Sequence, residues 1–152
     1  MGFRIRIDID PECDEEVVIK CKSITDEVLA LQAKLASNQG SEIELKLNDS
    51  IYFVRLSDIL FFETDSGKTA AHTADRMYYS DLKLYELEET LPQSFLRISK
   101  SSIINIAPIS SIRKDITGIC EVFFRNTNKK VYVSRSYSKV FREKINETRL
   151  NQ

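Results

Sequence analysis

The chain has 152 residues, 42% apolar and 30% charged, a balance typical of a soluble globular domain with or without a small appendage. No apolar run approaches the length of a membrane span, and the start MGFRIRIDID does not resemble a signal peptide, so we expect a cytoplasmic protein that is not inserted in a membrane. The three cysteines have no metal-binding or redox spacing, and the four scattered glycines form no phosphate-binding loop. We therefore expect neither a metal site nor a cofactor.

The net charge of −1 averages two unlike halves of the chain. Residues 1–63 contain 7 Lys/Arg and 13 Asp/Glu, whereas residues 95–152 contain 12 Lys/Arg and 4 Asp/Glu. The basic second half indicates an anionic partner, although an unevenly charged, solvated surface accounts for the same counts.

Residues 1–40 are predicted to form a β-β-α appendage. The alternating segment FRIRIDI (3–9) and the segment VVIKCK (17–22) predict two strands on either side of an acidic turn. A helix capped by Ser23 or Thr25 follows, with an apolar face made of Ile24, Val28, Leu31 and Leu35. A unit this small cannot bury its own apolar surface. We expect it to pack on the rest of the chain or to form a dimer with a second copy.

Residues 41–152 are predicted to form a mostly β (α+β) domain of many short strands. Strands are expected at 42–47, 51–56, 58–63, 68–73, 77–79, 95–98, 109–113, 119–124 and 130–133. Two helices are expected, one from a cap at Ser80 to Thr90 and one from Ser136 to Arg149. The inward residues of the second helix are predicted to be Tyr137, Val140, Phe141 and Ile145.

Few residues are candidates for catalysis. His72 is the only histidine and lies in an alternating strand, where histidines are usually packed or at the surface. Glu63 could act as a general acid or base in principle, but pairing with Arg or Lys, or capping the loop that follows, suits its position better. The serines at 99–102 have no histidine nearby in the sequence to activate them. We therefore expect a protein that is not an enzyme.

Five segments of the chain occur in an order typical of one family. They are DILFFE (58–63), AAHT (70–73), SDLKLYELEETL (80–91), FLRISKSSIINI (95–106) and VYVSRSY (131–137). Together they resemble the LytTR family, the DNA-binding domain of LytR/AgrA-type bacterial transcription regulators. The resemblance covers about residues 42–147 and implies an elongated stack of small, mainly antiparallel sheets with short helices.

The resemblance implies that loops, not a helix, contact DNA at three places. These are the loop with Ser66, Gly67, Lys68 and Thr69, the basic insert with Ser99, Lys100 and Ser101, and the pair Arg135 and Ser136. Arginine suits the O6 and N7 acceptors of guanine, lysine suits phosphate or guanine, and small residues let backbone N–H groups approach phosphates. Lys68 fits a solvated loop lysine equally well. The family has His where this chain has Ser99 and an aromatic residue where it has Lys68, so a different DNA sequence preference is expected.

Four polar residues near these places are expected to be structural. Arg97 is predicted to pair with an internal carboxylate, and Asn105 to hold a turn before Pro108. Lys129 and Lys130 are predicted only to cover a hairpin.

The sequence therefore predicts a transcription regulator that binds double-stranded DNA. The resemblance implies imperfect direct repeats in promoters, a homodimer at least on DNA, and control by a regulatory membrane protein. The forty residues before the domain are too few for a receiver domain, so the chain is similar to stand-alone regulators of the family rather than to complete response regulators. Two alternatives are a protein-interaction module whose basic C-terminal half docks an acidic partner, and a small-ligand sensor.

Overall fold

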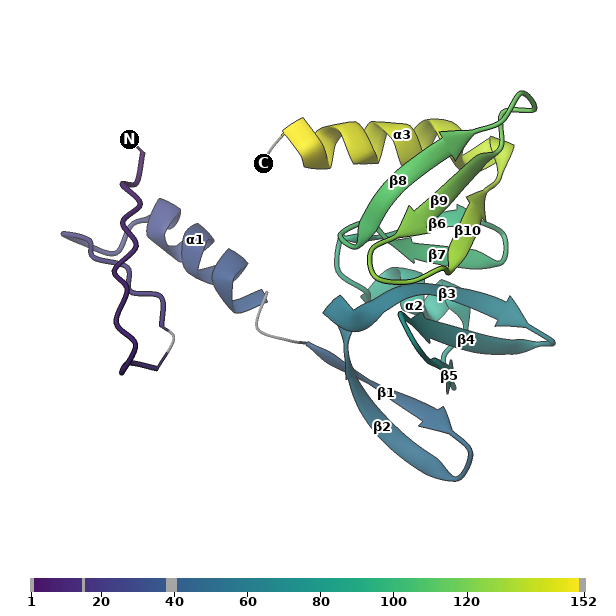
Figure 1. The fold of residues 1–152 in the computed structure, drawn as a ribbon, viewed down its shortest axis with the longest axis horizontal. Coiled ribbons are helices and arrows are strands. Elements are labelled where there is room, and N and C mark those ends of the chain that lie inside the picture. Colours follow the sequence, from purple (N-terminus) through teal and green to yellow (C-terminus); the bar gives the residue numbers. More distant parts are fainter. Residues whose placement is uncertain (1, 15, 38–40, 151–152) are drawn as a thin grey trace. The chain divides into compact units, whose positions relative to one another are not determined.

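The structure is a computed structural model that describes residues 2–14, 16–37 and 41–150 (Figure 1). The chain divides into two units, Met1–Ala36 and Ser37–Gln152. The sequence motifs of the predicted DNA-binding domain all lie in the second unit.

The first unit contains one helix, α1 (Asp26–Ser37). Thr25 precedes it, and its hydroxyl accepts a hydrogen bond from the backbone N–H of Val28 at 3.3 Å, so Thr25 caps the helix as one of the two predicted candidates. Val28 is buried and Leu31 and Leu35 are half-buried, but Ile24 lies before the helix and is exposed.

The two strands predicted at 3–9 and 17–22 are wrong for this structure, because none of the described residues from 2 to 25 belongs to a strand. The alternating pattern is present, but an isolated segment becomes a strand only when its backbone groups pair with a neighbour. The large apolar side chains of both segments are exposed, namely Phe3, Ile5, Ile7, Ile9, Val17 and Val18.

The second unit is built on a seven-stranded antiparallel sheet in the order β2-β1-β5-β4-β3-β7-β6. Its strands are β1 (Glu42–Leu47), β2 (Ser50–Arg55), β3 (Ile59–Asp65), β4 (Lys68–Thr73), β5 (Met77–Ser80), β6 (Phe95–Ser99) and β7 (Ser102–Asn105). A short 3-10 turn (Leu56–Asp58) links β2 to β3. The turn between β1 and β2 contains Asn48 at φ 55°, a left-handed conformation that asparagine tolerates.

A three-stranded antiparallel sheet in the order β10-β9-β8 completes the β structure. It consists of β8 (Ile109–Lys114), β9 (Cys120–Phe124) and β10 (Lys130–Val133). Two helices belong to this unit, α2 (Leu84–Thr90) and α3 (Arg135–Leu150). The mostly β class with mainly antiparallel sheets and short helices is therefore confirmed.

Two apolar cores hold the second unit together. One lies around β1, β3, β5, β7 and α2 and includes Phe62 and Leu87, both fully buried. The other joins β3, β6 and β7 to the three-stranded sheet and α3, and Phe141 is its fully buried helix residue. Tyr137 and Ile145 pack on this second core as predicted, whereas Val140 is about half exposed and does not face inward.

Most predicted element boundaries differ from the observed ones by one or two residues, and two differences are larger. Helix α2 begins at Leu84, because Ser80 is the last residue of β5 and its hydroxyl accepts the N–H of Leu82 at 3.1 Å. The segment 102–105 is a full strand, β7, so the polar insert before it is the tip of the β6–β7 hairpin.

Candidate nucleic-acid interface

Three loops of the second unit come together at one end of the strands of the seven-stranded sheet. The β3–β4 and β6–β7 turns lie at the same end of the seven-stranded sheet, because Glu63 of β3 pairs with Ser102 at the start of β7. The backbone N–H of Thr64 donates to the carbonyl of Ser101 at 2.9 Å. The junction between β10 and α3 joins this end through residue 134, whose N–H donates to the carbonyl of residue 98 at 3.0 Å. Residues 65–68, 99–102 and 134–136 are called the loop edge, and Figure 1 shows them on the right.

The β3–β4 turn has a tight two-residue tip. Ser66 (φ 51°) and Gly67 (φ 80°) are both left-handed, as in the hairpin turns that match the twist of the flanking strands. Lys68 is exposed, and its ammonium lies over the ring of Tyr79 at 5.6 Å from the centroid. Thr69 is only 5% exposed, so its side chain is not available to DNA and the prediction for this residue is corrected.

The β6–β7 turn carries exposed Lys100 and Ser101 at its tip. Arg97 stabilises this turn through two hydrogen bonds. Its Nε donates to the carbonyl of Ser99 at 2.7 Å, and its Nη2 donates to the carbonyl of Lys100. The same guanidinium pairs with Glu88 of α2 at 3.0 Å, so Arg97 has a carboxylate partner as predicted, but that carboxylate is exposed rather than internal. These hydrogen bonds to the turn were not predicted, because every residue has a backbone carbonyl and the sequence does not show which one accepts.

The β10–α3 junction carries exposed Arg135 and Ser136. The hydroxyls of Ser134 and Ser136 lie 3.3 Å apart at the start of the helix. The first N–H groups of a helix have no partner within it, and its amino end carries a partial positive charge that favours anions. The guanidinium of Arg135 adds a full charge at the same place.

Two cations of the loop edge differ in their partners from two cations of the three-stranded sheet. Neither Lys100 nor Arg135 forms an ion pair within the part of the chain that the structure describes. In contrast, Arg113 and Lys130 both pair with the buried carboxylate of Glu121, and these hydrogen bonds, Lys130 first, hold the pKa of Glu121 below its ordinary value. Lys130 therefore does more than cover a hairpin, and that prediction is corrected.

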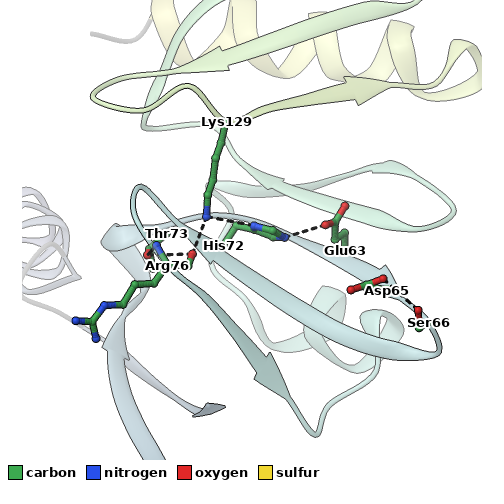
Figure 2. Close-up of polar contacts among 7 residues, drawn as sticks. All are labelled: Glu63, Asp65, Ser66, His72, Thr73, Arg76 and Lys129. Carbon is green, nitrogen blue, oxygen red and sulfur yellow. Dashed lines mark hydrogen bonds and ion pairs between the residues drawn. The ribbon is translucent and has the colours of Figure 1, made fainter. Parts of the chain in front are cut away.

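A second polar cluster joins the two sheets (Figure 2). The hydroxyl of Thr127, in the β9–β10 turn, donates to the carbonyl of Ala74 at 2.8 Å. The ammonium of Lys129 donates to the carbonyl of Arg76 at 2.7 Å. Both carbonyls belong to the β4–β5 turn, so the β9–β10 hairpin is fastened to it and the prediction that Lys129 only covers a hairpin is wrong.

His72 extends this cluster into the seven-stranded sheet. Its Nε2 lies 2.8 Å from a carboxylate oxygen of Glu63, and its Nδ1 lies 3.3 Å from the ammonium of Lys129. Its ring stacks on Phe61 at 4.3 Å between centroids. Neutral histidine satisfies both contacts when Nε2–H donates to Glu63 and Nδ1 accepts from Lys129. We call this cluster the clasp; it consists of Glu63, His72, Thr127 and Lys129 with the carbonyls of Ala74 and Arg76.

Burial lowers the pKa of His72 from its ordinary value of 6.5, although the hydrogen bond and charge of Glu63 oppose this effect. Burial likewise lowers the pKa of Lys129. The histidine, expected to be packed rather than catalytic, is half-buried and serves as a link between strands. Glu63 pairs with histidine, not with the Arg or Lys that its position suggested.

Among the described residues, no three His, Cys, Asp or Glu side chains lie close enough together to hold a metal ion. None of the described helices has the length and apolar character needed to cross a membrane.

Comparison with known proteins identifies the family of the second unit. Residues 49–146 match the LytTr DNA-binding domain, which is more than half of the chain. The chain belongs to the LytTR family. The second unit therefore carries a DNA-binding domain of the LytTR family. That family is defined by DNA binding rather than by catalysis.

Solved and curated relatives agree with this membership. A LytTr DNA-binding domain from Bacillus cereus superposes with a TM-score of 0.65 at 29% identity, covering 69% of this chain and 96% of that one. An uncharacterized HTH-type transcriptional regulator of Staphylococcus aureus strain NCTC 8325 is 31% identical over 99 residues, 65% of this chain and 67% of the relative. A counterpart in strain MRSA252 is 30% identical over the same length. In the described residues α1, α2 and α3 are separated by strands, so no two successive helices form a helix-turn-helix motif.

Proposed function

We propose that this LytTR protein is a sequence-specific transcription regulator that binds duplex DNA at promoter direct repeats through its loop edge. The proposed contacts come from three loops, so that each loop supplies a short stretch of the interface. They are Ser66, Gly67 and Lys68, then Ser99, Lys100 and Ser101, then Arg135 and Ser136.

The convergence of three loops with unpaired cations carries this proposal. Lys100 lies at the end of the seven-stranded sheet and Arg135 at the start of α3, and no described carboxylate pairs with either. Arg135 suits the O6 and N7 acceptors of guanine, whereas Lys100 suits phosphate. The hydroxyls of Ser66, Ser101 and Ser136 are small donors that allow close approach to the phosphate backbone.

Further parts of the proposal rest on the likeness to the family. We propose that the protein works in the cytoplasm, binds DNA as a homodimer and is held in check by a membrane protein. Two protomers on adjacent repeats would raise the effective concentration of each DNA-binding unit, which increases the overall affinity without new contacts.

The experiment is selection of bound sequences from a random duplex pool, followed by fluorescence anisotropy with the selected operator and a scrambled duplex. We expect binding to the operator that is at least about 10³-fold tighter than to the scrambled duplex and that weakens steeply with salt, because phosphate contacts release counterions. Failure to enrich any sequence, together with tight binding to an acidic protein captured from a lysate, would favour a protein-interaction module instead.

A further inference from the structure

The first unit exposes an unusual amount of apolar surface for its size. Its exposed large hydrophobic residues are Phe3, Ile5, Ile7, Ile9, Val17, Val18, Ile24 and Leu29. Ile5, Ile7 and Ile9 are 91%, 82% and 89% exposed. They alternate with charged residues, so in an extended conformation all three lie on one face. An exposed, alternating apolar segment of this kind marks an interaction site.

The charges between these isoleucines are arranged antisymmetrically. Arg4 and Arg6 precede Ile7, and Asp8 and Asp10 follow it at the same spacings. Reversing the direction of the segment about Ile7 therefore exchanges every positive charge with a negative one. Two copies of such a segment are complementary when they run in opposite directions.

We propose that residues 4–10 form an antiparallel strand pair with the same segment of a second copy of this chain, centred on Ile7. In this register each Ile7 lies opposite the other, and each Ile5 lies opposite an Ile9. On the other face Arg6 lies opposite Asp8 and Arg4 opposite Asp10, so four cross-strand ion pairs form. Opposite charges and β-branched pairs directly across an antiparallel ladder stabilise it.

Two other arrangements do not match the charges. A parallel in-register pair would place each Arg opposite an Arg and each Asp opposite an Asp, which is destabilising. The edge strand β2 has the sequence SIYFVR, with a single charged residue, and offers no complement to two arginines followed by two aspartates. Self-complementarity favours a second copy, because a two-fold interface brings the same patch of both chains together.

The chain also limits the length of the strand. Pro11 has no N–H to donate to a ladder, so the pair ends after residue 10. The backbone N–H of Glu12 donates to the carboxylate of Asp10 at 3.0 Å, and the N–H of Cys13 donates to the Asp10 carbonyl at 3.3 Å. These contacts form a turn directly after the proposed strand. Because all the residues involved lie in the first unit, the inference is independent of the proposed DNA contacts.

A charge-exchange experiment tests the pairing. One full-length variant carries Arg4→Asp and Arg6→Asp, and a second carries Asp8→Arg and Asp10→Arg. We expect the unmodified chain to sediment as a dimer at about 50 µM, and the dimer dissociation constant of each variant alone to rise by at least about tenfold, because each ion pair becomes a repulsion. Mixing the two variants should restore association, because every opposed pair is then Arg with Asp.

A cross-linking experiment tests the register. The exposed Cys13 and Cys21 are first replaced by Ser, so that they form no cross-links of their own. In this background Ile7→Cys should form an intermolecular disulfide under mild oxidation, because directly opposed residues in an antiparallel pair lie within disulfide range. Ile5→Cys alone should not, since its two copies would lie about 13 Å apart along the ribbon, but Ile5→Cys mixed with Ile9→Cys should.

Each result decides the matter without reference to DNA. A monomeric full-length chain at about 50 µM overturns the proposal. So does a dimer that both charge variants leave intact, or a mixture of the variants that stays monomeric. Cross-linking of Ile5→Cys alone as efficiently as Ile7→Cys would overturn the register. Operator binding measured in parallel tests the proposed function separately, because the loop edge is unchanged in all these variants.

Discussion

The loop edge and the clasp use the same kinds of residue for opposite purposes. In the clasp, the ammonium of Lys129 is engaged by the carbonyl of Arg76 and by His72, so its charge fastens one sheet to the other. At the loop edge, Lys100 and Arg135 are exposed and have no ion-pair partner in the described part of the chain. The difference teaches that the partners of a cation, not its type or its place in a basic stretch, decide whether it holds the fold or is available to a ligand.

Arg97 is paired like the cations that hold the fold but supports a turn of the loop edge, so its replacement should have the largest effect. The variant Arg97→Met leaves the carbonyls of Ser99 and Lys100 without their donor and Glu88 without its partner. We expect the free energy of unfolding to fall by about 1–2 kcal/mol, and operator affinity to fall by about tenfold because the turn carrying Lys100 loosens. Denaturant titration and fluorescence anisotropy measure the two effects.

The matched control for this variant is Arg125→Met, which removes the same charge from an exposed side chain at the end of β9. It should leave stability nearly unchanged and reduce DNA affinity only slightly. If Arg97→Met weakens the fold but binds the operator like the unmodified chain, the β6–β7 turn does not contact DNA.

Arg135 tests whether a cation without an ion-pair partner contacts DNA. Arg135→Ala should cost about 1–3 kcal/mol of operator affinity if its guanidinium contacts a base, with no measurable change in unfolding free energy. The control is Arg149→Ala, which makes the same charge change on the same helix about 21 Å away. Equal losses of affinity from the two variants would mean that only the overall charge of α3 matters, and not a contact made by Arg135.

Much of the second unit follows from its sequence, because most of its neighbouring strands are consecutive along the chain, the exceptions being β1 beside β5 and β3 beside β7. Alternation places EIELKL (42–47) in β1, and Asn48 and Asn126 mark hairpin turns through left-handed backbone conformations. The same alternation in FRIRIDI (3–9) does not form a strand in the single chain. A pattern indicates which face would be buried, but it does not supply the neighbouring strand.

The candidate site was predictable only in part for a similar reason. The exposed residues of the turns could be anticipated, because hairpin tips are solvated. The burial of Thr69 could not, because it depends on pairing with Ser80 in β5. Nor could the role of Lys129, whose acceptor at Arg76 lies 53 residues away in the sequence.

Lys129 tests whether a cation of the clasp stabilises the fold, and the expected loss of stability is smaller than for Arg97. Lys129→Met should lower the free energy of unfolding by about 1 kcal/mol, because a partly exposed, charge-assisted hydrogen bond between the sheets is lost. Lys139→Met removes the same charge from an exposed position on α3 and should not change stability. Both variants should bind the operator alike. A larger loss of affinity in Lys129→Met would mean that the clasp also shapes the loop edge.

The smallest expected effect is a pH dependence that arises in the clasp. Burial lowers the pKa of His72 below 6.5, while Glu63 and Asp65 oppose the shift and Lys129 adds to it. In the interval between the lowered pKa and 6.5 the unfolded chain binds more protons at this residue than the folded chain does. The contribution of His72 to stability is therefore complete above pH 6.5 and decreases as the pH falls through that interval.

His72→Gln provides the reference for this measurement, because glutamine does not titrate. Unfolding free energies of both proteins, measured from pH 7.5 down to about 5, should show the unmodified chain losing stability relative to the variant below pH 6.5. Protonation would place an N–H of the imidazole opposite the ammonium of Lys129, 3.3 Å away, and weaken the link between the sheets. A difference that grows in the opposite direction would mean that Glu63 stabilises a charged His72. Glu63 of the clasp and Asp65 of the loop edge lie two residues apart on β3 (Figure 2). If His72→Gln changed operator affinity but not stability, the clasp would have to influence the loop edge through this strand.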